Sequence, residues 1–256
     1  MEDEKKTFTG MKENHIEGRN AVLEAFRSGR TIDKLYVLDG CQDEPVRSIT
    51  REARKHDTIV NYVTKERLDQ ISETGKHQGV IAVSAAYDYA KVEDILALAE
   101  KKGEPPFILI LDGIEDPHNL GAIIRTANQA GAHGVIIPKR RAVGLTPTVA
   151  RTSAGAVNYV PVAKVTNISN TMKELKDRGM WFVCADMDGT LMYDMDLTGP
   201  IGLVIGNEGD GVSPLVKKNC DMVASIPMKG DIDSLNASVA AGVLSYEIVR
   251  QRMKKG

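Results

Sequence analysis

Short apolar segments alternate with helical patterns through the second part of the chain, and this alternation constrains the fold more than any other feature. The segments occupy 107–111, 134–137, 159–163, 181–185, 201–205 and 222–226. Most are apolar throughout, which is typical of strands buried on both faces of a parallel sheet covered by helices. We therefore predict an α/β domain with a mainly parallel sheet. Ligands of such sheets bind beyond the carboxyl ends of the strands.

The first part of the chain has a smaller α/β pattern of its own. Helical spacing at 18–26, 44–55 and 65–71 alternates with strand-like segments at 34–38, 58–63 and 80–83. A polar, proline-rich stretch at 101–106 indicates a domain boundary. We predict a disordered tail over 1–13, a domain over 14–86, a linker over 87–104 with one weak helical pattern, and a second domain over 105–256.

Charge and cysteine content narrow the function classes. The 256 residues include 33 basic and 35 acidic side chains, a formal net charge of −2. Non-specific polyanion binding needs a strongly cationic surface, so any nucleic acid must be recognised by local patches. Three distant cysteines and five scattered histidines predict no metal and a reducing, cytoplasmic location. Every apolar run is too short for a membrane span, so no membrane partner is expected.

The loop at 112–118 leads into a helical pattern with two polar residues of interest. Asn119 stands where a helix cap is expected, and four apolar positions between 120 and 127 supply a buried face. Arg125 lies near the edge of that face, on an element that begins at the ligand side. Taken alone, Asn119 is equally well explained as a cap, and Arg125 is better explained as a surface residue.

Glycine is concentrated in the loop that follows 201–205. Three glycines within six residues, starting at Gly206, let the backbone approach a ligand closely. The loop lacks the Lys-Ser/Thr ending of a phosphate-binding P-loop, and Glu208 and Asp210 would repel a polyphosphate. The loop therefore favours a cationic or neutral ligand, although ordinary turns also collect glycine.

The loop after 222–226 leads into the last helical pattern. Ser234 and Asn236 are good capping residues, and Leu235 between them would be exposed unless it covers a pocket or packs on the core. An ordinary capped C-terminal helix would also explain this segment.

Together the three segments resemble the three motifs of the SpoU family of RNA ribose methyltransferases. The matching stretches are NLGAIIRTA at 119–127, IGNEGDG at 205–211, and IPM with SLNASVA within 226–240. The resemblance covers the chain from about residue 105 to the end. It implies a deep trefoil knot, which pattern reading alone would reject, and a homodimer whose active site uses residues of both subunits.

The first domain resembles the ribosomal-protein-L30-like substrate domain of bacterial 23S ribosomal RNA guanosine 2′-O-methyltransferases. The segments that carry this likeness are 16–22 and 76–82. The resemblance implies RNA contacts by Arg19, His77 and Gln78. His77 and Gln78 are equally well explained as a structural turn before the strand.

The resemblance to the SpoU family also implies a cofactor and an active site. S-adenosylmethionine is the expected cofactor, with a site formed by Gly206, Asn207, Ile226, Met228 and Leu235. The expected active-site residues are Asn119, Arg125, Glu208 and Asn236.

Transfer to a ribose 2′-hydroxyl requires stabilisation of a developing alkoxide. Arg125 suits this role better than that of a base, because an arginine side chain is not deprotonated in proteins at neutral pH. Glu208 is expected to orient Arg125 or to receive the proton through water. Two alternatives stay open, a transfer-RNA 2′-O-methyltransferase and a non-catalytic ribosome-associated RNA-binding protein. A nucleotide-dependent oxidoreductase is disfavoured, because no Gly-x-Gly-x-x-Gly follows the first strand of the second domain.

Overall fold

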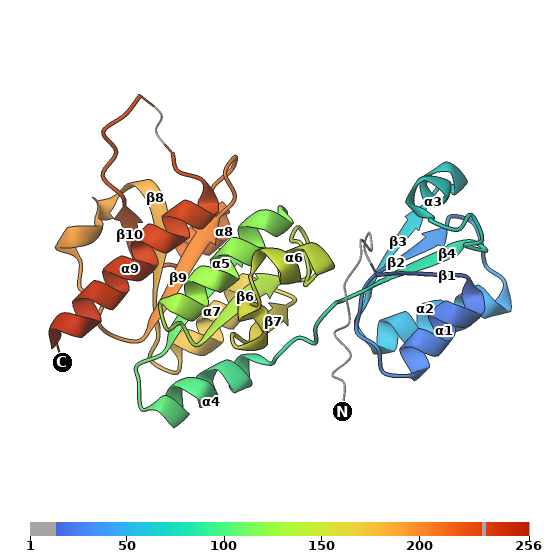
Figure 1. The fold of residues 1–256 in the computed structure, drawn as a ribbon, viewed down its shortest axis with the longest axis horizontal. Coiled ribbons are helices and arrows are strands. Elements are labelled where there is room, and N and C mark those ends of the chain that lie inside the picture. Colours follow the sequence, from blue (N-terminus) through green and yellow to red (C-terminus); the bar gives the residue numbers. More distant parts are fainter. Residues whose placement is uncertain (1–13, 232–233, 256) are drawn as a thin grey trace, which may run out of the picture. The chain divides into compact units, whose positions relative to one another are not determined.

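The computed structural model describes residues 14–231 and 234–255, so the tail expected over 1–13 lies outside the described residues. Within them the chain forms two compact units (Figure 1). The first comprises 14–88 with 144–147, and the second comprises the rest.

The first unit is a four-stranded sheet with helices. Its elements are β1 (His15–Glu17), α1 (Arg19–Arg27), β2 (Ile32–Leu38), α2 (Glu44–Lys55), β3 (Ile59–Val63), α3 (Lys65–Ile71) and β4 (Val80–Ser84). The strand order is β1-β4-β2-β3, with β2 and β3 parallel and the other pairs antiparallel. Leu35 and Val37 of β2 pack against Val22 of α1 and Ile49 of α2 in one buried cluster.

The second unit is built on a six-stranded sheet. Its strands are β5 (Phe107–Asp112), β6 (Gly134–Pro138), β7 (Val162–Val165), β8 (Trp181–Leu191), β9 (Ile201–Gly206) and β10 (Met222–Ser225). Its helices are α4 (Val92–Lys102), α5 (Pro117–Gln129), α7 (Ile168–Lys176), α8 (Pro214–Lys218) and α9 (Ala237–Lys255), while α6 (Pro147–Thr152) begins at the last residue assigned to the first unit.

All neighbouring strands of this sheet are parallel, in the order β10-β8-β9-β5-β6-β7. The prediction of a parallel α/β domain is therefore confirmed. Ile108 and Ile110 of β5 share a buried cluster with α4 and α7. Leu109 and Leu111 are also fully buried, and alternation along the strand turns them to the other face. The knot implied by the resemblance stays a prediction.

The segment predicted as a linker, 87–104, mostly belongs to the second unit. The chain divides between Asp88 and Tyr89, and α4 follows. Ile95 is fully buried, and its side chain lies so close to Gly134 that a Cβ there would meet Ile95 Cδ1 at 2.5 Å. The weak helical pattern was therefore a core-facing helix, and the proline-rich stretch merely ends it.

Strands β7 and β8 differ from their predicted bounds by several residues. The strand expected at 159–163 starts at Val162, because Pro161 has no N–H for the ladder and Val160 closes a turn by donating to the Ala156 carbonyl. Strand β8 runs on to Leu191 through polar residues. Val223 of β10 pairs with Cys184 of β8, but the next residue, Ala224, pairs with Thr190. Residues 185–189 of β8 therefore bulge out of the ladder.

In the part of the chain that the structure describes, every helix is too short or too polar to cross a membrane.

A carboxylate stabilises the first unit and makes its stability depend on pH. Glu17 accepts hydrogen bonds from Ser72, Glu73 and Thr74. Burial, the largest influence, raises the pKa of Glu17, but these hydrogen bonds together lower it to about 2. The stabilisation is therefore complete above the ordinary pKa of 4.5 and is lost as the pH falls towards 2.

We expect Glu17→Gln to lower the protection of this unit by about 2 kcal/mol at pH 7, because hydrogen bonds to a charged acceptor are lost. The difference from the unsubstituted protein should shrink as the pH falls below 4.5. Hydrogen exchange of the backbone amides of 72–84 in the full chain measures both effects. Glu24→Gln, at an exposed position of α1, is the control, and an equal effect of both substitutions would contradict the prediction.

Candidate active site

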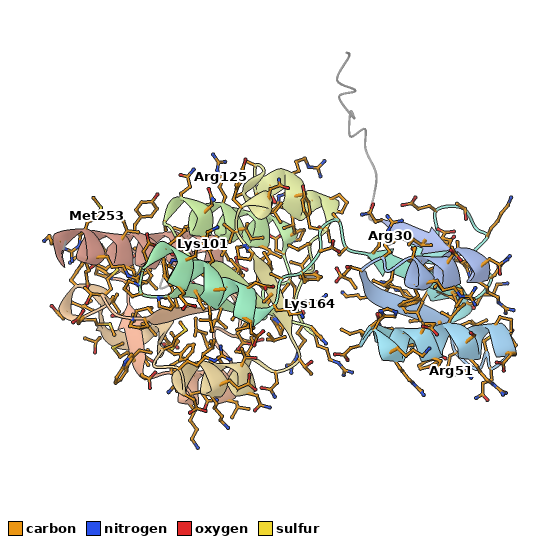
Figure 2. The ribbon with its side chains drawn as sticks, turned by 90° about the horizontal axis from the view of Figure 1, so that it is seen from below. Arg30, Arg51, Lys101, Arg125, Lys164 and Met253 are labelled. Carbon is orange, nitrogen blue, oxygen red and sulfur yellow. The ribbon has the colours of Figure 1, made fainter. Side chains whose placement is uncertain are left out.

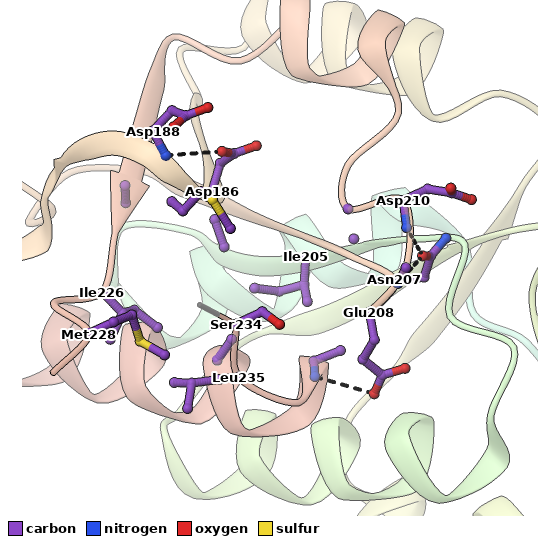
Figure 3. Close-up of a pocket in the computed structure, with 18 residues that line it drawn as sticks. Asp186, Asp188, Ile205, Asn207, Glu208, Asp210, Ile226, Met228, Ser234 and Leu235 are labelled. Carbon is purple, nitrogen blue, oxygen red and sulfur yellow. Dashed lines mark hydrogen bonds between the residues drawn. The ribbon is translucent and has the colours of Figure 1, made fainter. Parts of the chain in front are cut away.

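A pocket of about 330 Å³ lies at the carboxyl ends of β9 and β10, beside the bulge of β8. The bulge of β8, the glycine-rich loop after β9 and the segment after β10 all contribute to its lining (Figure 3). Parallel strands bring their carboxyl ends to one edge of a sheet, so loops distant in sequence meet there. The pocket therefore occupies the position that the sequence predicts for a ligand.

The glycine-rich loop forms its part of the wall through close backbone packing. A Cβ on Gly206 would lie 2.0 Å from the backbone carbon of Gly211, so no larger residue fits without displacing the loop. The side-chain oxygen of Asn207 accepts hydrogen bonds from the N–H groups of Gly209 and Asp210, at 2.9 and 2.7 Å. Asn207 thus shapes the loop as well as lining the pocket.

An apolar surface faces this loop. Ile226, Met228 and Leu235 gather on one side of the pocket in Figure 3. Leu235 therefore covers a pocket, which was one of the two explanations for an apolar residue at that position. With Gly206 and Asn207, all five residues predicted to bind the cofactor line the same pocket.

Carboxylates make the pocket electronegative. Glu208 and Asp210 were noted in the sequence, whereas Asp186 and Asp188 from the bulge of β8 were missed. The amino group of Lys217 bonds to Asp186 at 2.6 Å and lowers the pKa of that carboxyl, so Asp186 is ionised at neutral pH. The available signal was a pair of acidic residues directly after the apolar run 181–185.

Three of the four predicted catalytic residues meet beside the pocket. Glu208 Oε1 accepts hydrogen bonds from Asn119 Nδ2 at 2.6 Å and from Asn236 Nδ2 at 2.7 Å. Asn236 Nδ2 also lies 3.0 Å from Asn119 Oδ1, which closes a triangle of side chains. We call Asn119, Glu208 and Asn236 the polar triangle. It joins α5, the glycine-rich loop and the start of α9.

Asn119 and Asn236 were both expected to be helix caps, and the structure confirms this for Asn236 but not for Asn119. Helix α5 begins at Pro117 with Asp116 as its cap, so Asn119 lies inside the helix, buried, and serves the polar triangle instead. At α9, Asn236 Oδ1 accepts from the N–H of Ser238 at 2.9 Å, so Asn236 is a cap as well as a member of the triangle.

Arg125, the fourth predicted catalytic residue, does not join the triangle within one chain. It is exposed, six positions after Asn119 on α5, and so about 120° away round the helix. Figure 2 shows its side chain projecting outward from α5. Any site that uses this guanidinium must therefore lie on the outer surface of α5.

The residues predicted to contact RNA hold the first unit together. Arg19 Nε donates to the Gln78 carbonyl at 3.0 Å, and its guanidinium pairs with Asp43 at 2.6 Å. His77 is buried, with Nε2 2.9 Å from Asp69 and Nδ1 accepting from the Gly79 N–H. The ring of His77 therefore has no nitrogen left for RNA, which supports the structural-turn explanation, whereas Arg19 and Gln78 keep their RNA role as a prediction.

The pocket has the characteristics of a site for S-adenosylmethionine. Its volume lies in the range of small-molecule sites, its apolar wall suits an adenosine, and its carboxylates suit a ligand with sulfonium and ammonium charges. Among residues 14–231 and 234–255, no group of three or more His, Cys, Asp or Glu side chains is placed to hold a metal ion. The parallel sheet and this pocket define the class as an α/β protein whose site suits S-adenosylmethionine.

Comparison with known proteins gives the family. The model of the SpoU rRNA methylase family matches residues 106–246, and a model of RNA 2′-O ribose methyltransferase substrate binding matches 15–90. The chain belongs to the SpoU family, and it is an RNA methyltransferase that uses S-adenosylmethionine.

The relatives span nearly the whole chain. A Bacillus subtilis protein named as the TrmH family tRNA/rRNA methyltransferase YacO is 48% identical over 95% of this chain and 98% of its own length. A similarly named protein of Staphylococcus saprophyticus is 46% identical over 94% and 97%. The solved structure of the SpoU methyltransferase AviRb from Streptomyces viridochromogenes, with its cofactor, has a TM-score of 0.61 at 28% identity, covering 94% of this chain and 91% of that one.

Proposed function

We propose that this enzyme methylates the ribose 2′-hydroxyl of a guanosine in 23S ribosomal RNA, in the cytoplasm. The observation that carries the proposal is the polar triangle beside the electronegative pocket, in a chain with a separate substrate-binding unit. The structural neighbours favour ribosomal over transfer RNA. An rRNA methyltransferase of Sinorhizobium meliloti covers 92% of this chain at a TM-score of 0.57, whereas a tRNA-modifying enzyme from A. aeolicus covers 64%.

The residues of the pocket divide the work of holding the cofactor. Backbone groups at Gly206, Ile226 and Leu235 bind it, and Met228 and Asn207 complete the lining. S-adenosylmethionine, when bound, supplies an electrophilic methyl group on a positively charged sulfur. Nearby carboxylates favour that charge without needing to move.

The polar triangle positions the ribose. Glu208 is fixed through one oxygen by the two asparagine side chains, which leaves its other oxygen to face substrate. The guanidinium of Arg125 stabilises the negative charge that develops on the 2′-oxygen and binds the adjacent phosphate. Such stabilisation needs no neutral arginine.

The exposed position of Arg125 supports a homodimer. Val239, Tyr246 and Met253 are spaced by seven along α9 and are 49%, 51% and 77% exposed, an apolar stripe that a partner would cover. Between the first two lies Gly242, where a Cβ would be 4.0 Å from Thr126, the neighbour of Arg125. Helices α5 and α9 pack together (Figure 1). A dimer through this stripe would bring Arg125 close to the interface, and we propose that its guanidinium there serves the site of the partner.

The test is incubation of the purified protein with methyl-labelled S-adenosylmethionine and separated 23S, 16S and transfer RNA from a strain that lacks the gene. We expect label in 23S RNA alone, at one guanosine whose 3′ bond resists alkali because its 2′-oxygen is blocked. Label in transfer RNA alone would contradict the substrate while keeping the chemistry. Bound cofactor with no labelled RNA would point to the non-catalytic alternative.

A further inference from the structure

The first unit has a groove of about 550 Å³ between the outer side of α2 and the edge strand β3. The loop after β2, from Asp39 to Gln42, closes one end of it. Strands β2 and β3 are the parallel pair of this sheet, so their carboxyl ends share an edge where ligands commonly bind. None of the residues predicted to contact RNA lines this groove.

Three arginines line the groove from one side. Arg47, Arg51 and Arg54 stand at positions i, i+4 and i+7, which places them on one face of α2. All three are exposed, and in the part of the chain that the structure describes their guanidinium groups make no hydrogen bond or ion pair. Figure 2 shows the Arg51 side chain projecting outward from α2.

The nearby carboxylates leave this side of the groove positive. Asp43 is paired with Arg19 at 2.6 Å, and Glu52 is paired with Lys55 at 2.7 Å. Asp39 at the end of the groove accepts from the Gly40 N–H. The chain as a whole carries a charge of −2, so this cluster is a local patch.

Tyr62 supplies an aromatic surface on the other side. Alternation along β3 places Tyr62 on the same face as Val60, which packs against the buried cluster beneath α1 and α2. Tyr62 therefore points towards the side of the sheet that α2 covers, and it is 55% exposed in the groove. A large aromatic residue left open beside three free guanidinium groups has no evident role in packing.

We infer that this groove binds an unpaired strand of the RNA substrate, with phosphates on Arg47, Arg51 and Arg54 and a base stacked on Tyr62. The inference rests on the proposed function, since it gives the substrate-binding unit its contact surface. Single-stranded RNA is recognised by this combination of cationic groups that follow the backbone and aromatic rings that stack with bases. An acidic protein would use the arginines but would gain little from an open tyrosine ring.

The test uses the full-length protein and a fluorescein-labelled single-stranded RNA of mixed sequence, titrated at several salt concentrations. We expect Arg47→Ala/Arg51→Ala to weaken binding more than tenfold and to reduce the slope of log affinity against log salt by about 1.4, because each contact with a single-strand phosphate contributes about 0.7. Tyr62→Ala should weaken binding about tenfold with the slope unchanged, and Tyr62→Phe should bind normally.

The matched control is Arg27→Ala/Arg30→Ala, which removes two exposed arginines of the same unit outside the groove. Equal binding by both double variants would overturn the inference, as would tighter binding of poly-glutamate than of the RNA by the unsubstituted protein. Methyl transfer is measured separately. If the groove variants bind and methylate normally, the inference fails and the proposed function stands. If the groove binds RNA but no RNA is methylated, the inference stands and the proposed function fails.

Discussion

Replacing Arg125 with alanine should reduce methyl transfer by about 10²- to 10³-fold while leaving the affinity for S-adenosylmethionine unchanged. This is the range seen when a group that stabilises a developing oxyanion is removed. The side chain is exposed on α5 and lies outside the pocket lining, so neither folding nor cofactor binding depends on it. Single-turnover transfer and calorimetric titration of the cofactor measure the two quantities. Arg178→Ala, at an exposed residue of the same unit, is the control.

A mixing experiment asks whether Arg125 serves the partner's site. Subunits with Arg125→Ala are combined with subunits with Glu208→Gln, which keeps the shape of the triangle but removes its charge. In a dimer with shared sites, one site of each mixed dimer has both residues intact, so the mixture should regain about a quarter of full activity, since half of the dimers are mixed. No recovery in verified mixed dimers would place Arg125 and Glu208 in the same chain's site.

Gly206→Ala should weaken the binding of S-adenosylmethionine by about a hundredfold or more. The added Cβ would lie 2.0 Å from the Gly211 carbon and 2.2 Å from the Val212 nitrogen, so backbone must shift in the loop that walls the pocket. Overpacking of this kind costs about 3 kcal/mol, which corresponds to that factor. Calorimetry measures the affinity, and a thermal melt separates a local from a global effect.

The control for Gly206→Ala is Gly199→Ala, where a Cβ meets no atom within 4 Å. We expect its cofactor affinity to equal that of the unsubstituted protein. Normal binding by Gly206→Ala would show that the loop adapts, and the role given to its close backbone packing would then be wrong.

The predictions from sequence succeeded where one local property decides the structure. The wholly apolar segments predicted the parallel sheet, because a strand buried on both faces needs apolar side chains at nearly every position. The two asparagines at 119 and 236 were singled out by their positions near helix starts. Their hydrogen bonds to Glu208 depend on the tertiary fold, because Asn119 and Asn236 lie 89 and 28 positions from Glu208 in the sequence. The spacing of residues along the chain does not predict such contacts.

The features that were missed depend on contacts between distant elements or on a strand that continues into polar residues. The helical pattern of α4 was weak because only one narrow face of the helix is apolar. The helix is held in place by the packing of Ile95 against Gly134, which lies in β6 and is distant in the sequence. Asp186 and Asp188 were missed because the strand that carries them continues past its apolar part. The arginines of α2 are spread over eight positions of the helix, and only the packing of α2 against the sheet brings Tyr62 of β3 beside them.

The polar triangle also determines when the enzyme becomes active during its own synthesis. Its last member, Asn236, directly precedes α9, so the triangle cannot form until synthesis has passed residue 236. The first unit has its own buried core and is made first, and domains commonly fold in that order. We therefore expect a nascent chain that stops before residue 236 to have a folded first unit but no complete triangle, so that folding of the substrate-binding unit precedes assembly of the site.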